Sequence, residues 1–442
     1  MNDTTFAQTV KNMTYRDWKY CIIASVCVVG QYILPSLLHT VILLIGVAFS
    51  LKSTNFVFNK RIMFLIMPFV FLLPIGLISA WQWDMKDIFR DWWYVINPLF
   101  VLLAGGCFSE KIQGDLSIIL KSILVAATAF SLVHFYQIYV HLPELDSVFE
   151  LHNAYGTSLR TGSVLTALAI SILLYSEVSR FIEWRVGTKV IILLLCAISL
   201  ALSLSRSWLM SLVILTIVFS LLKVRKRKSI LVFSALTAVV IILFFLLFPM
   251  SDQAVSVCEG GFFCKILASV HEITPRYYLF IPDLKTYWRG YESYMAMQQY
   301  KDGNTFQLFF GQGLGVLIEL NISLVLGAAT YSKIPILHNG YMYALLKFGL
   351  AGLFIYVAQC MRFLILGLNA FVDDEYEQRL IGAFVISSSA MIMLLTFVNA
   401  GFFNKNSMIP VLFFMAALIR SRFYTIDKAI KAQANRDVKL RR

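Results

Sequence analysis

The sequence has little charge: Asp, Glu, Lys and Arg together make up 14% of its 442 residues. A soluble domain of this length needs more charge to cover its surface, so the composition excludes a soluble globular protein. Apolar residues are abundant instead, at 59% of the chain, and the mean hydropathy is +0.74. Runs of 15 to 24 residues with few or no charges recur from Tyr20 to Ile419. This pattern predicts an all-α protein that crosses a bilayer many times.

Several catalytic signatures are also missing. The sequence contains no glycine-rich phosphate loop ending in Lys-Ser/Thr, no His-Glu-x-x-His helix and no Gly-x-Ser-x-Gly elbow. No segment between the apolar runs is long enough to form a cytoplasmic domain that holds ATP or a nucleotide sugar. These absences exclude an ATP-driven pump and direct attention to the non-cytoplasmic side of the membrane.

Apolar runs broken by charges or turn residues predict twelve membrane spans, within a range of eleven to thirteen. The spans are 18–34, 36–51, 63–81, 93–108, 117–140, 163–178, 189–205, 207–222, 229–249, 337–358, 380–399 and 406–419. The first run has no small-residue cleavage site behind it, so we expect a retained helix and not a removed signal peptide. The expected organisation is nine spans over 1–249, a large polar loop over 250–335, three spans over 336–420 and a basic tail over 421–442.

Lys and Arg indicate the orientation. With the N-terminus in the cytoplasm, 25 of the 38 Lys and Arg residues fall in cytoplasmic segments and 11 fall on the opposite side. Positive residues favour the cytoplasm, so we expect both termini there and loop 250–335 outside. Lys121 and Lys347 lie inside predicted spans, where each either snorkels or marks a misplaced span end. The net charge of +13 therefore indicates orientation and a tail near anionic headgroups, not binding to nucleic acid.

Two of the seven cysteines, Cys258 and Cys264, lie in the exported loop. A disulfide between them is favoured, because disulfides persist in oxidising compartments, and two unpaired thiols are the alternative. The other five cysteines lie in or beside spans and are expected to be small apolar packing residues.

Three exported places carry residues suited to chemistry. The first is Ser205-Arg206-Ser207, a short turn between two apolar runs. An arginine near hydrocarbon is costly and usually has a partner or a function. The alternative is that Arg206 snorkels to the headgroups.

The second place is Tyr287-Trp288-Arg289-Gly290-Tyr291-Glu292, followed by the glycine-rich segment from Phe310 to Gly315. Arginine binds phosphate oxygens through two parallel hydrogen bonds, so this segment suits an anionic or sugar-bearing ligand. The alternative is a surface helix on which Arg289 pairs with Glu292, since residues three apart are neighbours on a helix.

The third place is Leu337-His338-Asn339-Gly340-Tyr341, where the loop returns to the membrane. An imidazole takes a proton from a hydroxyl near neutral pH. The alternative is a histidine that caps or packs at a helix start. His141 and His152 share another exported loop, but no metal-ligand spacing links them to His338, so no metal site is predicted.

The three segments, in this order along the chain, make the sequence resemble the O-antigen ligase/polymerase superfamily of bacterial polysaccharide assembly, the Wzy/WaaL type. The matching segments are Ser205 through Leu209, Arg289 through Ala296 with Phe310 through Gly315, and His338 through Tyr341 with Lys347 through Leu353. Arg160-Thr161-Gly162 before a span is a weaker match. The resemblance covers about residues 200 to 365, and the first 150 residues match in hydropathy only.

The resemblance implies a GT-C-like, metal-independent, inverting glycosyltransferase of the bacterial inner membrane, without a cofactor, that uses undecaprenyl-pyrophosphate-linked glycans. By position, Arg206, Arg289 and Arg160 bind the lipid pyrophosphate, and His338 is the base for the acceptor hydroxyl. Guanidinium groups stabilise the negative charge of a departing pyrophosphate, and a cavity that positions both lipid-borne substrates supplies the remaining catalysis. The resemblance also implies a polysaccharide chain-length regulator as a partner.

The His-Asn-Gly-Tyr string with the later Lys347-x-Gly349 looks more like the polymerases, because in the ligases an acidic residue often follows the His-Asn pair. We therefore expect a polymerase that joins O-antigen repeat units. The alternatives are a ligase that moves glycan onto lipid A-core, a lipid-glycan flippase or other secondary transporter, and a membrane scaffold. Transporters place ionisable groups at mid-membrane and often show inverted repeats, whereas here only Lys121 and Lys347 qualify and no repeat is visible.

Overall fold

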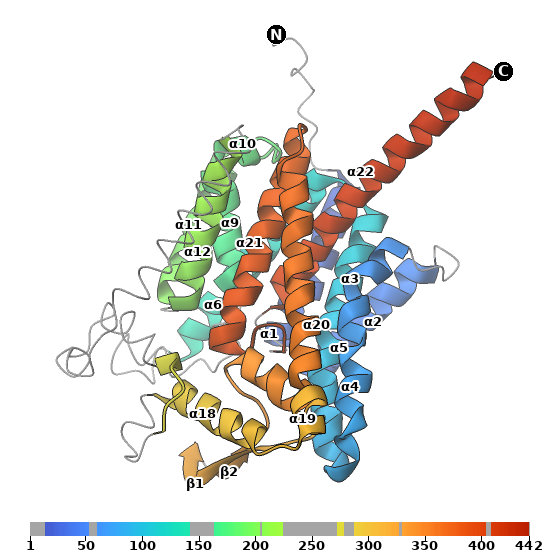
Figure 1. Ribbon diagram of the computed structural model, residues 1–442. Coiled ribbons are helices and arrows are strands. Elements are labelled where there is room, and N and C mark those ends of the chain that lie inside the picture. The colour runs from blue at the N-terminus through green and yellow to red at the C-terminus, as the bar shows by residue number, and fades with distance from the viewer. Residues whose placement is uncertain are drawn as a thin grey trace.

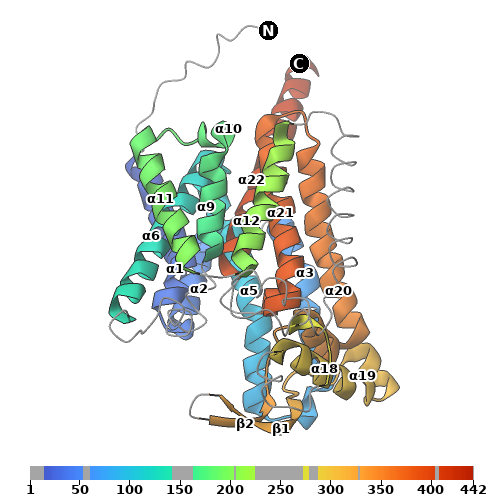
Figure 2. The same ribbon diagram turned by 90° about the vertical axis from the view of Figure 1, so that its left-hand side faces the viewer.

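The computed structural model describes residues 14–52, 60–141, 163–203, 206–223, 272–277, 287–326, 329–403 and 408–441. In these ranges the chain is mostly helical, and its long helices run side by side as a bundle (Figures 1 and 2). The main helices are α1 (Tyr15–Ile33), α2 (Ser36–Lys52), α3 (Lys60–Val70), α4 (Leu72–Ile78), α5 (Met85–Lys111), α6 (Leu116–His141), α9 (Ser163–Leu174), α10 (Ser176–Ser179), α11 (Val186–Leu202), α12 (Arg206–Ser220), α18 (Trp288–Lys301), α19 (Thr305–Phe310), α20 (Gly340–Phe371), α21 (Tyr376–Asn399) and α22 (Ile409–Arg441). Short 3-10 turns occur at Ala80–Gln82, Leu221–Lys223 and Gly401–Phe403.

Every predicted span except 229–249 overlaps one of these helices or two consecutive ones, and span 229–249 lies outside the described residues. Among the described residues, 5 helices are long and apolar enough to cross a membrane, namely α5, α6, α20, α21 and α22. Other apolar helices, such as α9, α11 and α12, are shorter. The structure thus supports a helical membrane protein with several spans, and the number twelve stays a prediction.

Proline and glycine interrupt two of the predicted spans. Span 63–81 is divided into α3 and α4, and α3 contains Pro68 shortly before its end at Val70. Proline has no N–H to donate and its ring clashes with the preceding turn, which breaks helices. Gly349 interrupts α20 with a φ of 65°, a conformation that glycine adopts at little cost. A short first part of α20, up to Gly349, therefore differs in direction from the long part that follows.

The core lies between α5 and α22. In their apolar windows 78% and 72% of residues are buried, against 33% for α20, which therefore turns much of its surface outward. Gly105 of α5 allows close contact, because a Cβ at that position would lie 2.1 Å from the carbonyl oxygen of Phe413 in α22. The first three turns of α22 are apolar on all sides, as expected of a fully buried helix.

The segments predicted to be cytoplasmic meet at one end of the bundle. Arg420 of α22 pairs with Glu110 at the end of α5 at 2.5 Å, and Arg61 at the start of α3 pairs with Asp427 at 2.6 Å. At this end α22 continues beyond the other helices (Figure 1), so most of the predicted tail 421–442 is helical, up to Arg441. The gathering of these segments agrees with the alternation of sides that the basic residues predict.

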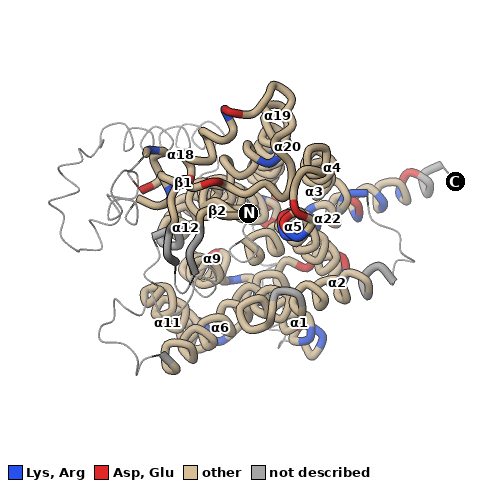
Figure 3. Tube along the Cα trace, turned by 90° about the horizontal axis from the view of Figure 1, so that it is seen from below, with Lys and Arg blue, Asp and Glu red and all other residues tan. Residues whose placement is uncertain are grey.

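The elements of loop 250–335 gather at the opposite end, where α18 and α19 lie beside a β-hairpin (Figures 1 and 2). Strands β1 (Ile318–Leu326) and β2 (Ala329–Ile334) pair antiparallel. The expectation of an all-α fold is therefore too simple for the described loop. Its sequence explains the strand, because buried Ile318 and Leu320 alternate with polar Glu319 and Asn321. Seen from this end, charged residues are sparse along the chain (Figure 3).

Candidate functional site

The central contact at the loop-bearing end joins Glu292 of α18 to His338. Glu292 is 1% exposed, and its Oε1 accepts hydrogen bonds from Nδ1 of His338 at 2.9 Å and from the backbone N–H of His338 at 2.5 Å. The His338 side chain itself remains 41% exposed. With a carboxylate as its partner, Nδ1 is assigned as the donor, and Nε2 is then the basic atom of the ring.

The residues after His338 hold this contact in place. The Asn339 side chain accepts hydrogen bonds from the N–H of Tyr341 at 3.0 Å and of the next residue, and it thereby caps α20. A Cβ at Gly340 would lie 2.6 Å from the carbonyl oxygen of Ala400, so only glycine fits where α20 begins beside the end of α21. The Tyr341 hydroxyl donates to a carbonyl oxygen of α21 at 2.8 Å. The residues from Asn339 to Tyr341 therefore fix the start of α20, and the imidazole of His338 lies just before the first turn of this helix.

Arg289 lies on α18 one turn before Glu292. The alternative in which these two residues pair is not the observed one, because Arg289 Nη1 pairs with Glu272 at 3.1 Å. A Cβ at Gly290 would lie 2.3 Å from the carbonyl oxygen of Thr274, so this glycine lets the segment that carries Glu272 lie against α18. The Arg289 side chain is 28% exposed. A guanidinium has five donors, and its exposed part remains accessible to an anion.

The aromatic residues around Arg289 pack the helix against the hairpin. Tyr291 is fully buried, and its hydroxyl donates to the carbonyl oxygen of Leu320 in β1 at 2.5 Å. Burial raises the pKa of Tyr291, so the hydroxyl stays protonated as a donor. Gln299 donates to the carbonyl oxygen of Leu317 at 3.0 Å. These contacts orient α18, and with it Arg289 and Glu292.

The glycine-rich segment from Phe310 to Gly315 packs against the interruption of α20. Gly311, Gly313 and Gly315 have φ values of 82°, 92° and 95°, which favour glycine. A Cβ at Gly311 would lie 2.3 Å from the backbone of Lys347, and one at Gly349 would lie 2.4 Å from the backbone of Phe309, so the segment fits into the interruption of α20. Each N–H from 311 to 315 is donated within the protein, to carbonyl oxygens of Gln307, Leu346, Lys347 and Gly76 and to the Asp91 carboxylate. These N–H groups are not open to an anionic ligand.

Lys347 does not snorkel, and it lies two residues before the interruption of α20 at Gly349. Its ammonium group is fully buried and forms an ion pair with the equally buried Asp91 of α5. Lys347 Nζ also donates to the carbonyl oxygen of Val316 at 2.8 Å, and Asp91 accepts from the N–H of Gly315 at 2.7 Å. The pair therefore connects α5, α20 and the glycine-rich segment. Lys121, the other lysine within a predicted span, is also buried, at 5% exposure.

The remaining predicted site residues are only partly placed. Arg206 is the first residue of α12, and its side chain lies outside the described part of the chain. Leu222, just beyond α12, accepts a hydrogen bond from Arg379 at the start of α21, so α12 begins toward the end that carries α18 (Figures 1 and 2). Arg160, Cys258 and Cys264 lie outside the described residues, and the predicted disulfide stays a prediction.

The arrangement at Glu292 and His338 suits the removal of a proton from a hydroxyl. A buried carboxylate on Nδ1 orients the imidazole and stabilises the imidazolium that forms when Nε2 takes up a proton. Arg289 precedes Glu292 by one turn on α18, so the guanidinium belongs to the same helix as the carboxylate that orients His338. The site can therefore bring a nucleophilic hydroxyl and a negatively charged group together.

The sequence does not predict a role for Glu272 or Asp91, or the pairing of Glu292 with His338. Glu292 lies 46 positions from His338 and Asp91 lies 256 positions from Lys347, so no local pattern links either pair. One feature of the sequence does indicate Glu292, because it is the only acidic residue from Trp288 to Lys301.

Comparisons with known proteins assign no function to this site. No family model and no curated protein matches the sequence. Any function assigned to the site therefore depends on Arg289, Glu292 and His338 and on the resemblance of the sequence to the ligase/polymerase superfamily.

Proposed function

We propose that the protein is an O-antigen polymerase, an inverting glycosyltransferase that moves glycan from a polyprenyl-pyrophosphate donor to a lipid-linked repeat unit. The observation that carries the proposal is the half-exposed imidazole of His338, which is hydrogen-bonded to the buried carboxylate of Glu292. Arg289 lies one helical turn before Glu292 on α18. A base and a guanidinium at one surface are the two groups that this reaction needs when the leaving group is a pyrophosphate.

The reaction is a single displacement. Nε2 of His338 takes the proton of the acceptor hydroxyl while its oxygen forms a bond to the anomeric carbon of the donor sugar. The bond between that carbon and the pyrophosphate oxygen breaks on the opposite face, which inverts the configuration. The electron pair leaves with the polyprenyl pyrophosphate, and the imidazolium later releases its proton to water.

Arg289 is assigned to the leaving group. Its ion pair with Glu272 uses Nη1, and the other donors of the guanidinium can bind phosphate oxygens in parallel. Arg206 begins the helix that starts toward the same end and is assigned the same role, together with Arg160, from the resemblance. Charge that develops on the pyrophosphate is stabilised most where donors are positioned in advance.

The location of the site agrees with a lipid-borne substrate. The site lies at the end of an apolar bundle opposite to the end where the basic segments gather. Since positive residues favour the cytoplasm, we assign the site to the periplasmic face of a bacterial inner membrane. A pyrophosphate on a membrane-embedded polyprenyl chain would reach it at headgroup level.

A deletion strain tests the proposal. Lipopolysaccharide from this strain should show core that carries one repeat unit, and the wild-type chain should restore the ladder of long chains. His338→Ala should not restore it, although the variant reaches the membrane at the wild-type level. If polymer accumulates on the lipid carrier and none reaches the core, the protein is a ligase. If the deletion strain still makes long chains, or His338→Ala restores them fully, the proposal is wrong.

A further inference from the structure

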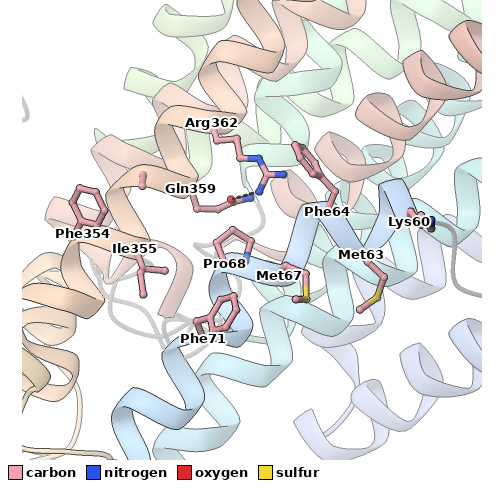
Figure 4. Close-up of a pocket in the computed structure, with 11 residues that line it drawn as sticks. Lys60, Met63, Phe64, Met67, Pro68, Phe71, Phe354, Ile355, Gln359 and Arg362 are labelled. Atoms are coloured by element: carbon pink, nitrogen blue, oxygen red, sulfur yellow. Dashed lines mark hydrogen bonds between the residues drawn. The ribbon is translucent and has the colours of Figure 1, made fainter.

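An apolar groove of about 620 Å³ lies between α3 and α20, away from Glu292 and His338 (Figure 4). One wall is formed by apolar side chains from Met63 to Phe71, and the other by Phe354, Ile355 and Ala358 of α20. Lys60 and Arg362 lie at one end. Phe71 and Phe354 are 54% and 72% exposed. A contiguous apolar surface of this kind marks a binding site or a membrane contact.

The floor of the groove is closed by contacts between the two helices. Nε2 of Gln359 donates to the carbonyl oxygen of Leu65 at 3.0 Å. Oε1 of Gln359 accepts from Nη1 of Arg362 at 3.4 Å, and the guanidinium of Arg362 lies 3.0 Å from the centroid of the Phe64 ring. The Arg362 side chain is therefore held at the groove, at the end where Lys60 also lies (Figure 4).

The charged residues that line the groove, among those the structure describes, are both basic. Lys60 and Arg362 are its only charged lining residues, and within the described part of the chain neither forms an ion pair with a carboxylate. Both residues lie just outside the predicted spans 63–81 and 337–358, at the expected level of the headgroups. An occupant should thus carry negative charge at this end.

The length of the groove matches one leaflet of a bilayer. From Lys60 to Phe71 the helical rise amounts to roughly 16 Å. Half of a hydrocarbon core is about 15 Å thick. A chain that lies along this apolar wall therefore extends from the headgroups to about the middle of the membrane.

We propose that this groove binds an anionic phospholipid, whose phosphate contacts Arg362 and Lys60 and whose acyl chain lies between α3 and α20. Two cations at one end and apolar side chains along one leaflet fit such a lipid better than a second copy of this chain, because the lining residues in the described ranges include no acidic one to meet those cations. The inference needs only a membrane location and does not depend on the proposed reaction.

The test is lipid binding to the purified full-length chain. The protein is incubated in detergent with phosphatidylglycerol or phosphatidylcholine, and bound lipid is counted by native mass spectrometry. We expect the wild type to bind one phosphatidylglycerol in preference to phosphatidylcholine. Arg362→Gln should lower the affinity for phosphatidylglycerol about fivefold, the factor that one cation near an anionic surface contributes. Arg362→Lys should keep most of it.

Matched controls distinguish lipid binding in the groove from non-specific electrostatic attraction between the protein and an anionic lipid. Arg180→Gln removes an exposed cation from a segment also predicted to be cytoplasmic and should leave binding unchanged. Ala358→Trp should fill the groove and weaken both lipids, whereas Leu194→Trp, at an exposed position of α11, should not. The proposal is wrong if Arg362→Gln and Arg180→Gln have equal effects, or if inorganic phosphate competes as well as the lipid. It is also wrong if Ala358→Trp dissociates a dimer without changing lipid binding.

Discussion

At the loop-bearing end of the molecule, the pair of Asp91 with Lys347 and the pair of Glu292 with His338 differ in burial. Asp91 and Lys347 are both fully buried, whereas Glu292 is buried and His338 is 41% exposed. Both carboxylates also accept a backbone N–H. The fully buried pair of Asp91 and Lys347 holds helices together. In the other pair the exposed imidazole of His338 can exchange a proton with a substrate. Sequence alone points to His338 and Lys347, but only the partners distinguish their roles.

The largest effect is expected for the fully buried pair. Lys347→Met removes the buried cation of this pair and leaves Asp91 with only the longer contact to Arg90, at 3.5 Å. The free energy of unfolding should therefore fall by about 3 kcal/mol, the lower end of the range for a broken buried pair. Thermal unfolding of the purified protein in detergent measures this loss. The matched control is Lys333→Met, which breaks an exposed pair with Glu319, with side chains 51% and 57% exposed, and should cost less than about 1 kcal/mol. Equal stability of the two variants would show that the buried pair does not hold the helices together.

The pair of Glu292 and His338 should affect catalysis instead of stability. Glu292→Gln keeps an acceptor for the His338 backbone but removes the charge that stabilises the imidazolium, so kcat should fall by about 100-fold while KM changes little. Glycan transfer by the reconstituted protein gives both constants. Glu319→Gln, on the neighbouring hairpin, is the control and should leave kcat unchanged. A normal kcat for Glu292→Gln, or an equal loss in the control, would assign the carboxylate a packing role.

A smaller effect is expected at the guanidinium of α18. Arg289→Lys keeps the positive charge but loses the planar set of donors, so KM for the pyrophosphate-linked donor should rise by about tenfold. Initial rates at increasing donor concentration measure this change. Arg276→Lys, an exposed position in the segment near Glu272, should leave KM as in the wild type. If the two variants behave alike, Arg289 does not bind the leaving group.

The smallest effect is expected at the partner of Arg289. Glu272→Gln removes a carboxylate that competes with pyrophosphate for the guanidinium, so KM should fall, by no more than about fivefold, because a partly exposed ion pair contributes under about 1 kcal/mol. The same initial-rate measurement applies. A rise in KM would show that Glu272 orients Arg289 for binding and does not compete with the donor.

Much of the helical architecture follows from the sequence, because an apolar run long enough to cross a bilayer has few other structures available. The exceptions arise from single residues. Pro68 lies near the division of a predicted span into α3 and α4, and Gly349 interrupts α20 where the glycine-rich segment inserts. The hairpin is hard to predict because the alternation from Ile318 to Asn321 spans only four residues, the shortest pattern that indicates a strand.

The candidate site was predictable in its residue types and not in its pairings. Arg289 and Glu292 are spaced to pair with each other on a helix, yet Glu272 and His338 are their partners. Long-range packing of α18 against the start of α20 decides this, and it leaves no local pattern in the sequence. The glycine-rich segment predicts a ligand loop, but its N–H groups donate hydrogen bonds within the protein.

The most direct test is glycan transfer by His338→Gln in proteoliposomes that contain a defined polyprenyl-pyrophosphate-linked repeat unit. We predict that the wild type extends the repeat into longer chains, also in the presence of a chelator. His338→Gln should unfold at the same temperature but transfer glycan at least about 100-fold more slowly, because it lacks the base. A correctly folded His338→Gln protein that polymerises at the wild-type rate would contradict the account.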